Sequence, residues 1–507
     1  MEITWNILSY LLSFLQAVFI VFILFFERKD AGRKFSWMLI IFFLPGVGIF
    51  LYFMLSGHFF TKTRKMDRIQ RHIYDLSKPF LTEQEAYFDK VKAKIKNKTL
   101  TEYSDIVKMN FAQAASNISF TKSISEYISG EEMYHALIQD LESAKSSIFM
   151  EFFTFREDTI GKRIMDILCR KAKDGVEVKL LYDDFGSLLT RRKFFEKLDK
   201  AGGSSIPFFP IRMGLPLTVN FRNHRKNVVI DETIGYMGGI NIGDEYITGL
   251  GKNPEKPWRD THLRVTGTCV ASMLITFLID YHSCAYGKKA LKSTKKAEAY
   301  FPLEKIKSLN KEIQKDIKND IPGDDIIPVQ LLLSGPNANR QHQIRDCMIC
   351  MIMSAKQSVY IQTPYFTPDE SFFSALKIAA MAGRDIRVIV PQHWDKIYVK
   401  AAAFQFMREL MEYGVKFYAY PGFIHAKTLT IDEKLTTIGT TNIDTRSFEL
   451  HFEMNMIFYD EGFAKRNAEI FQADIKKSRP LELEWFNSQF ILRRTLWSFC
   501  KLFSPIM

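Results

Sequence analysis

The sequence predicts an α/β protein in which two tandem α/β half-domains form one shared active site, preceded by two N-terminal transmembrane helices. Three observations lead to this fold class. The pattern His-x-Lys-x4-Asp occurs twice, at 224–231 and at 425–432. A similar alternation of strand-like and helix-like stretches precedes each copy. Two long apolar segments lie ahead of both copies, near the N-terminus.

Composition limits the kind of partner. The chain has 507 residues, of which 47% are apolar, so it can hold two large half-domains with sizeable cores. Lys and Arg outnumber Asp and Glu by 69 to 57, which gives a net charge of +12. This balance indicates an anionic partner, either nucleic acid or an acidic membrane surface, or else a solvated basic surface.

The first expected element is a membrane anchor. Residues 3–26 carry no charge and are long enough to cross a hydrocarbon layer of ~30 Å as a helix. The short apolar core and the small-residue cleavage site of a signal peptide are not visible. A second apolar run, 35–57, is interrupted by Pro45 and two glycines, which membrane helices tolerate. We expect a two-helix anchor over 1–58, with a re-entrant second segment as the alternative.

The charges that flank the two apolar segments are too balanced to orient the anchor. Four basic residues stand in the intervening loop and four follow the second segment: Arg28, Lys29, Arg33 and Lys34, then Lys62, Arg64, Lys65 and Arg68. The stretch that follows is polar, charged and helix-like. We therefore expect a helical connecting segment over 59–118.

Two repeats of strand-like and helix-like pieces come next. Residues 143–155 join a helix end to an apolar strand, and 164–184 join an amphipathic helix, a glycine turn and a second strand. The same pieces recur in the same order at 354–366 and 373–391. Strands that alternate with helices imply βαβ units and a sheet covered by helices.

The repeats set the expected domain boundaries. We expect the first half-domain over 119–300, a hydrophilic linker over 301–325, and the second half-domain with a C-terminal tail over 326–507. The tail is rich in aromatic and basic residues. Such a tail suits either a membrane surface or packing against the second half-domain.

Each repeat ends at its His-x-Lys motif. The β-branched residues of the motif favour a strand, in which His224 and Lys226 face one side, as do His425 and Lys427. A turn and a second strand then lead to matching Gly and Asn positions: Gly238, Gly239 and Asn241, and Gly439 and Asn442. One such match arises by chance about once in ten thousand positions, so two with the same continuation indicate a duplication. Two halves packed face to face would bring both histidines into one site.

This set of residues suits a phosphodiester substrate. Lys226 and Lys427 can neutralise the non-bridging oxygens, and Asn241 and Asn442 can donate further hydrogen bonds. The glycines can let the backbone come close to the phosphate. One imidazole can attack phosphorus and form a covalent phosphohistidine, while the other protonates the departing alcohol and deprotonates the incoming one.

No cofactor is expected. If the lysines carry the charge, the reaction needs no metal, and the sequence shows no convincing carboxylate cluster for Mg²⁺. Among the six cysteines, Cys347 and Cys350 form a CxxC pair, but no second pair stands at zinc-ligand spacing. Their apolar surroundings favour a place in the core over a redox or metal role.

The paired motifs with their trailing Gly and Asn resemble the phospholipase D superfamily. Further stretches resemble bacterial cardiolipin synthases over nearly the whole chain: LPGVGIFLYFMLSG (44–57), WRDTHLRVTG (258–267), TPYFTPDES (363–371) and NIDTRSFELHFEMN (442–455). The resemblance implies two phospholipase D-like half-domains. It also implies transfer of a phosphatidyl group between two phosphatidylglycerol molecules in a bacterial cell membrane, with release of glycerol and without a nucleic-acid partner.

The resemblance implies roles for four carboxylates. Asp260 and Glu453 would orient the catalytic imidazoles, whereas Asp231 and Asp432 would mostly hold the motif hairpins. From the residues alone, the first pair could equally be surface or salt-bridge carboxylates.

The resemblance also favours His224 as the nucleophile and His425 as the general acid and base.

The chain departs from the family pattern at His451, where Asn would be expected. The alternatives are a hydrolytic phospholipase D, a nuclease, a phosphatidyltransferase for another lipid alcohol, and a membrane-bound scaffold, which two intact motifs argue against. We expect the lipid substrates on the inner leaflet, which favours an active site on the cytoplasmic side. The sequence does not identify the acceptor lipid or the oligomeric state.

Overall fold

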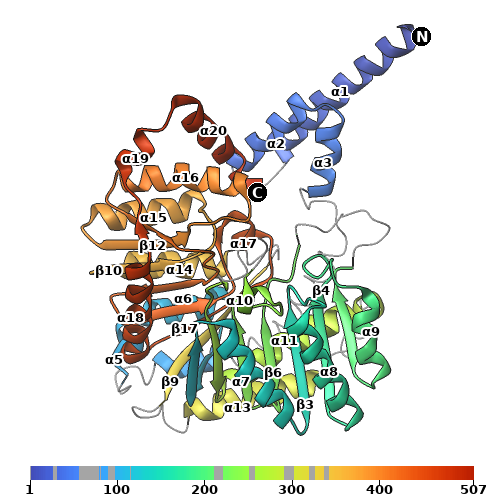
Figure 1. Ribbon diagram of the computed structural model, residues 1–507, viewed down its shortest axis with the longest axis vertical. Helices are drawn as coiled ribbons and strands as arrows, with labels where there is room; N and C mark the ends of the chain where they lie inside the picture. Colours follow the sequence, from blue (N-terminus) through green and yellow to red (C-terminus); the bar gives the residue numbers. More distant parts are fainter. Residues whose placement is uncertain are drawn as a thin grey trace.

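The protein consists of two α/β halves of the same design, with helices at the N-terminus (Figure 1). The structure, a computed structural model, describes residues 2–26, 31–55, 79, 81–89, 97–114, 116–210, 221–249, 257–290, 302–318, 326–335 and 342–506.

The N-terminal apolar segments form three helices, α1 (Glu2–Phe26), α2 (Ala31–Phe43) and α3 (Val47–Leu55). The second segment is divided because Pro45 disfavours helix at the preceding residue and Gly46 has a φ of +81°. The resulting helices have 13 and 9 residues, fewer than the ~20 of a membrane-crossing helix. Within the described ranges, no helix is both long enough and apolar enough to cross a membrane, so the expected pair of transmembrane helices is not supported.

Most charges that bear on the orientation of the anchor lie outside the described residues, namely Arg28, Lys29, Lys62, Arg64, Lys65 and Arg68. The same holds for much of the expected connecting segment. Its described part contains α5 (Lys98–Glu102) and α6 (Ser104–Ala114), whose Val107 and Phe111 join the core of the second half.

The first half contains a seven-stranded mixed sheet of order β2-β8-β7-β6-β3-β4-β5. Its strands are β2 (Ser123–Tyr127), β3 (Ser147–Phe152), β4 (Glu177–Asp183), β5 (Ser204–Phe208), β6 (Asn227–Ile230), β7 (Ile234–Gly238) and β8 (His262–Thr266). Its main helices are α7 (Gly130–Ser143), α8 (Thr159–Lys173), α9 (Arg192–Lys200) and α11 (Cys269–Ala290). Side chains alternate along β3, so Ile148 and Met150 pack with α7, α8 and α9, while Phe149 packs with α11.

The second half contains a nine-stranded sheet of order β1-β9-β17-β15-β14-β10-β12-β13-β18. Its strands are β1 (Ile118–Thr121), β9 (Ile327–Ser334), β10 (Ser358–Gln362), β12 (Asp385–Pro391), β13 (Lys416–Tyr420), β14 (Thr428–Ile431), β15 (Leu435–Gly439), β17 (Glu453–Phe458) and β18 (Arg479–Pro480). Its main helices are α14 (Gln343–Ser354), α15 (Glu370–Met381), α16 (Ile397–Met411) and α18 (Glu461–Lys477). The run β17-β15-β14-β10-β12-β13 repeats β8-β7-β6-β3-β4-β5 of the first half. The predicted duplicated α/β fold is therefore confirmed.

The two halves share structure at their boundary. β1, from the start of the expected first half-domain, pairs with β9 in the sheet of the second half. The expected linker contains α13 (Leu303–Lys318), which packs against α11 and buries Ile306, Leu309 and Ile313 in a core that both halves build.

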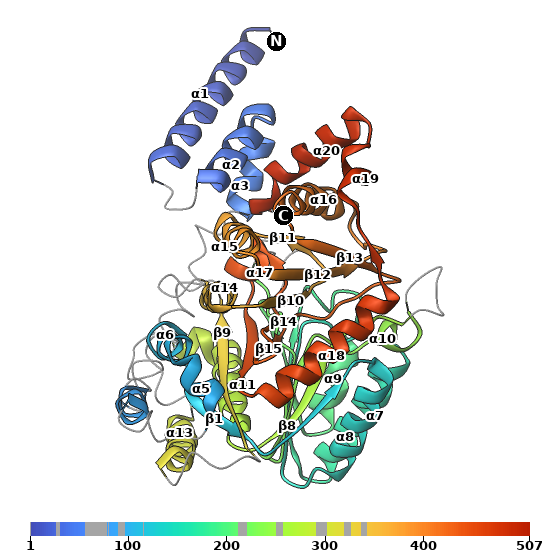
Figure 2. The ribbon, with the colours of Figure 1, turned by 90° about the vertical axis from the view of Figure 1, so that its left-hand side faces the viewer.

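The C-terminal tail forms α19 (Leu483–Asn487), α20 (Ile491–Leu502) and the short 3₁₀ helix η2 (Ser504–Ile506). α20 lies along α16 (Figure 2) and buries Trp497 to 3% exposure. The other side of α20 leaves large apolar side chains exposed, namely Leu492, Leu496 and Phe499. The tail therefore packs against the second half and still presents an apolar surface.

Candidate active site

Both motif histidines lie on segments that pair with the opposite half. The His224 N–H donates to the carbonyl of Phe452 at 2.9 Å, next to a bridge between Asn223 and Phe452. The His425 N–H donates to the carbonyl of Arg259 at 2.6 Å, next to a bridge between Arg259 and Ile424. Backbone contacts across the boundary thus bring together two histidines that stand about 200 positions apart.

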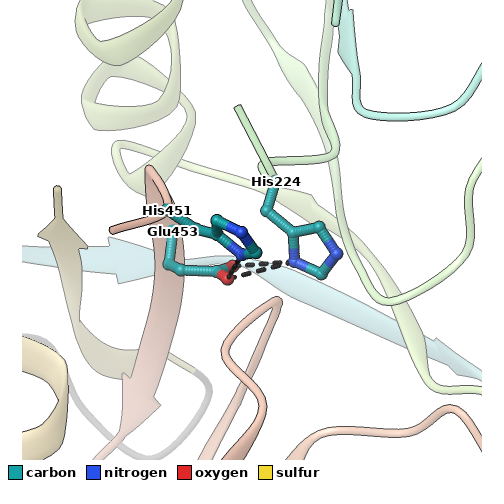
Figure 3. Close-up of side chains that lie close together, drawn as sticks. All are labelled: His224, His451 and Glu453. Atoms are coloured by element: carbon teal, nitrogen blue, oxygen red, sulfur yellow. Dashed lines mark hydrogen bonds and ion pairs between the residues drawn. The ribbon is translucent and has the colours of Figure 1, made fainter. Parts of the chain in front are cut away.

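Each imidazole is held by a carboxylate of the other half. His224 Nδ1 lies 3.1 Å from the carboxylate of Glu453 (Figure 3), and His425 Nδ1 lies 2.7 Å from Oδ2 of Asp260. Both carboxylates are fully buried, whereas both histidines are 7% exposed. With Nδ1 donating to a carboxylate, Nε2 of each ring is the atom left for chemistry.

The two motif lysines are buried beside their histidines. Lys226 Nζ donates to the carbonyl of His224 at 2.6 Å, and Lys427 Nζ donates to that of His425. Burial lowers the pKa of Lys226 to about 7 and that of Lys427 to about 8, although Glu453 and Asp260 oppose the effect. Both lysines therefore lose their positive charge near neutral pH, Lys226 before Lys427.

Burial and the nearby lysines also keep the imidazoles neutral. Burial, with Lys226 and Lys427, lowers the pKa of His224 well below its ordinary value. Burial and Lys427 lower the pKa of His425 to about 4, against the opposing charge of Asp260. Burial would raise the pKa of Asp260, but Lys427 and His425 outweigh it and hold this pKa below its usual value. These shifts pair neutral imidazoles with an ionised Asp260.

The two predicted asparagines are buried next to the motif hairpins. Asn241 Oδ1 accepts the N–H of Thr154 at 3.1 Å, and its Nδ2 donates to the Tyr246 hydroxyl at 3.1 Å. One hydrogen of this amide is left for a substrate. Asn442 is 3% exposed, and its Oδ1 has no hydrogen-bond partner among the described residues.

The motif glycines make room for neighbouring protein atoms. A Cβ on Gly238 would lie 2.5 Å from the Thr261 carbonyl, and one on Gly439 would lie 2.3 Å from the Met454 carbonyl. A Cβ on Gly239 would lie 2.0 Å from Oδ1 of Asp260. These positions stay glycine because a strand or the orienting carboxylate packs on them, which differs from the expected close approach to phosphate.

The motif aspartates stand at the other end of the hairpins. Asp231 follows β6, with a φ of +48°, and its carboxylate accepts the N–H groups of Lys145, Ser146 and Ser147 at 2.7–3.2 Å. Asp432 does the same in the second half for the N–H groups of Lys356, Gln357 and Ser358 at 2.7–2.9 Å. Both aspartates therefore tie the motif hairpin to the start of the neighbouring strand.

Several residues at the site could not be identified from the sequence. The Thr440 hydroxyl donates to Glu453, and the Tyr246 hydroxyl lies 3.4 Å from His425 Nδ1. The Phe153 ring lies 4.9 Å from the His224 ring, and Lys226 Nζ lies over the Phe153 ring. Thr440 follows the motif glycine at the position of Gly239 in the first half, which is the one sequence signal for it.

His451 and Trp258 occupy equivalent places in the two halves. His451 lies 5.4 Å from the His224 ring, and Trp258 lies 5.6 Å from the His425 ring. His451 Nδ1 also lies 3.6 Å from Glu453 Oε1 (Figure 3). Ligand atoms of His224, His451 and Glu453 all lie within 4.8 Å of one another, a spacing that a metal ion could bridge.

The site lies at the boundary of two duplicated α/β halves and contains two imidazoles, each held by a carboxylate, and two buried lysines. This arrangement defines a phosphodiester-transferring enzyme of the phospholipase D type. Residues 137–255 and 348–475 match the family described as "Cardiolipin synthase, PLD-like domain". Residues 14–57 match the family described as "Phospholipase_D-nuclease N-terminal".

Curated relatives cover the whole chain. Cardiolipin synthase 2 of Staphylococcus epidermidis is 36% identical over 99% of this chain and 98% of its own length. The major cardiolipin synthase ClsA of Bacillus subtilis is 34% identical over 99% of both chains. The protein belongs to the cardiolipin synthase family, whose members are phosphatidyltransferases of the phospholipase D superfamily.

Among solved structures, phosphatidylserine synthase of Haemophilus influenzae has a similar fold. It superposes with a TM-score of 0.59 at 16% identity, over 80% of this chain and 100% of its own. This likeness supports the fold of the two halves.

Proposed function

We propose that the protein transfers a phosphatidyl group from one phosphatidylglycerol to the hydroxyl of a second, which yields cardiolipin and glycerol. The observation that carries this proposal is the crossed pairing of each imidazole with a buried carboxylate of the other half. This pairing leaves two reactive Nε2 atoms in one site, as a double displacement requires. The similar proteins are named cardiolipin synthases, which supports cardiolipin as the product.

The first step forms the covalent intermediate. His224 Nε2 attacks the phosphorus, and the bond from phosphorus to the oxygen of the headgroup glycerol breaks. His425 gives a proton to that oxygen, so free glycerol leaves. Because the pKa of His425 is about 4 in the structure, the anionic phosphate must raise this pKa on binding.

The second step uses the same groups in reverse. His425 takes the proton from the hydroxyl of the second phosphatidylglycerol, whose oxygen attacks the phosphorus and breaks its bond to His224. Lys226 and Lys427 stabilise the charge on the non-bridging oxygens in both steps, with Asn241 and Asn442 as further donors. Protons balance, and His224 returns to its starting state.

Lipid analysis after expression in a bacterium that lacks its own cardiolipin synthases tests this function. We expect cardiolipin with the intact chain and none with His224→Ala. Free phosphatidic acid in its place would indicate hydrolysis, and a different phosphatidyl product would indicate another acceptor alcohol. Unchanged lipids with a chain that is expressed and folded would refute the proposal.

We also propose that the protein acts at the bacterial cell membrane, with both halves on the cytoplasmic side. Large apolar side chains of α1 are exposed, among them Phe14, Val18, Val21 and Phe25. Both proposed substrates are membrane lipids, which we expect on the inner leaflet after their synthesis. A reporter fused to the C-terminus should be active only in the cytoplasm, and activity only outside it would overturn this placement.

A further inference from the structure

Large apolar side chains are exposed at matching places in the two halves. Leu188 and Leu189 are 64% and 84% exposed, and Ile397 and Tyr398 are 83% and 51% exposed. We call these four residues the apolar rim. A single exposed leucine needs no explanation, but a matched pair in each half of a duplicated fold does.

The two pairs follow equivalent strands. Leu188 and Leu189 lie between β4 and α9, while Ile397 and Tyr398 begin α16, directly after β12 and its loop. β4 and β12 hold the same position in the repeated strand order, each between two parallel neighbours. In α/β sheets, ligands bind outside the carboxyl ends of such strands, which is where these loops lie.

Contacts link the first loop to the segment that carries His224. Asp183, the last residue of β4, accepts the N–H of Asn223 at 2.9 Å, and Asn223 directly precedes His224. The guanidinium of Arg222 lies 5.2 Å from the Phe185 ring in the same loop.

The second loop has a similar relation to His425. The N–H of His393 donates to the carbonyl of Gly422 at 3.2 Å, and the neighbouring Phe423 stacks on the His425 ring at 5.8 Å. The rim loops therefore lie beside the segments that carry both catalytic histidines.

Basic side chains accompany both pairs. Arg191, Arg192 and Lys193 follow the first pair, and Lys396 precedes the second, all with exposed positions. Aliphatic tips flanked by cations match a phospholipid surface, since the tips can enter the acyl region while the cations meet phosphate groups.

We propose that the apolar rim is a membrane-docking surface whose occupant is an anionic phospholipid bilayer, and that it holds the two histidines over the headgroups. The inference rests on the proposed lipid function. A substrate with two acyl chains stays in the bilayer, and imidazoles that are 7% exposed reach its phosphorus only if this edge of the protein lies against the headgroups.

Insertion is measured first, independently of activity. The full chain carrying Leu189→Trp or Ile397→Trp is placed in phosphatidylglycerol nanodiscs with brominated acyl chains, and quenching beyond that of the native tryptophans is recorded. Met381→Trp is the matched control, because Met381 is 66% exposed on α15, which leads into the opposite end of β12. We expect extra quenching at 189 and 397 and none at 381, and equal quenching at all three would overturn the proposal.

Kinetics provide the second measurement. With the double variants Leu188→Ser/Leu189→Ser and Ile397→Ser/Tyr398→Ser, we expect the KM for long-chain phosphatidylglycerol in mixed micelles to rise about tenfold. The kcat on dihexanoyl phosphatidylglycerol below its micelle concentration should change less than twofold. Ile378→Ser/Met381→Ser, which removes exposed apolar side chains of α15, should change neither.

The outcomes separate the two proposals. Equal loss on both substrates would give the rim a structural role, and no loss on either would remove its role in docking. A variant that loses a dimer by light scattering but keeps its quenching pattern would assign the rim to a second copy of the chain. Absence of transfer by the intact chain on either substrate would instead refute the proposed function.

Discussion

At the level of single residues, the two motif histidines are both held by a buried carboxylate but have different surroundings. His425 is bordered by the aromatic rings of Trp258, Phe423 and Tyr246, at 5.6–6.1 Å. The His224 ring instead lies 4.9 Å from the Phe153 ring and 5.4 Å from the His451 ring. The half-domains are therefore equivalent in fold but not in the polarity around each imidazole.

The division of labour between the histidines can be tested by trapping the intermediate. With a substrate that carries a good leaving group, His425→Ala should still form a covalent adduct on His224, since such a group departs without a proton. His224→Ala should form no adduct with any substrate. Mass spectrometry of a rapidly quenched reaction identifies the modified residue, and an adduct on His425 would reverse the assignment.

The buried lysines predict an alkaline limit to activity. A lysine is charged below its pKa, so pKa values of about 7 and 8 imply that kcat/KM falls as the pH rises through this range. Lys226→Arg should keep its charge and move the falling limb to higher pH, whatever its effect on the maximum rate. Initial rates from pH 5 to 10 would show this, and identical profiles would exclude Lys226 as the titrating group.

Metal removal tests whether the lysines replace a metal ion. We expect the purified protein in detergent to keep its activity in excess EDTA. Loss of activity that Zn²⁺ or Mg²⁺ restores would contradict this prediction. The cluster of His224, His451 and Glu453 would then be the first place to look for the ion, and His451→Asn should weaken the restored activity.

At the scale of elements, the motif hairpin has a catalytic end and a structural end. His224 and Lys226 both precede β6, which begins at Asn227, and Asp231 follows its last residue. Asp231 and its neighbour Glu232 both have positive φ, a conformation that short turns of hairpins require. The carboxylate of Asp231 then bonds backbone N–H groups at the start of β3, which holds the hairpin in register.

Loss of this structural end should cost stability more than catalysis. Asp231→Ala leaves backbone N–H groups of residues 145–147 without their acceptor and should lower the free energy of unfolding by about 1–3 kcal/mol. We expect kcat of the folded fraction to fall less than tenfold. Thermal unfolding with parallel assays measures both, and Asp432→Ala is the matched variant. A 1000-fold loss of kcat at unchanged stability would instead place the aspartate in the chemistry.

At the scale of the whole molecule, the two halves are locked together where the site is built. Arg259 of the first half forms a buried ion pair with Asp474 of the second at 2.7 Å. Arg225 Nε donates to the carbonyl of Glu453 at 3.2 Å. β1 and the shared core around α13 add further contacts between the halves. A single chain therefore supplies all the residues of the site described above.

A complementation experiment tests this self-contained site. Because each histidine is paired with a carboxylate of the same chain, a mixture of His224→Ala and His425→Ala chains should remain inactive. Both variants should be co-expressed, which gives them the chance to assemble, and cardiolipin formation should be measured. Recovery to about a quarter of the activity of the intact chain would indicate halves exchanged between two chains.

The duplication, which the structure confirms, could be predicted from the repeated motifs, and the same motifs led to the proposed chemistry. Strand alternation predicted that His and Lys face one side of each motif segment, because successive side chains of an extended chain point to opposite faces. Periodicity and turn residues predicted the βαβ units that the two sheets contain. These features are local, so they can be recognised without knowledge of what packs against them.

How the two halves combine is visible only in the folded chain. The sequence does not show that Glu453 serves His224 and Asp260 serves His425, because both pairs join residues from different halves. Thr440, Tyr246 and the matched exposure of the apolar rim depend on the same packing. Pro45 showed in the sequence as a break, yet the division into α2 and α3 became visible only in the structure. The physical reason is that pKa shifts, crossed hydrogen bonds and exposure arise from neighbours that the folded chain brings together.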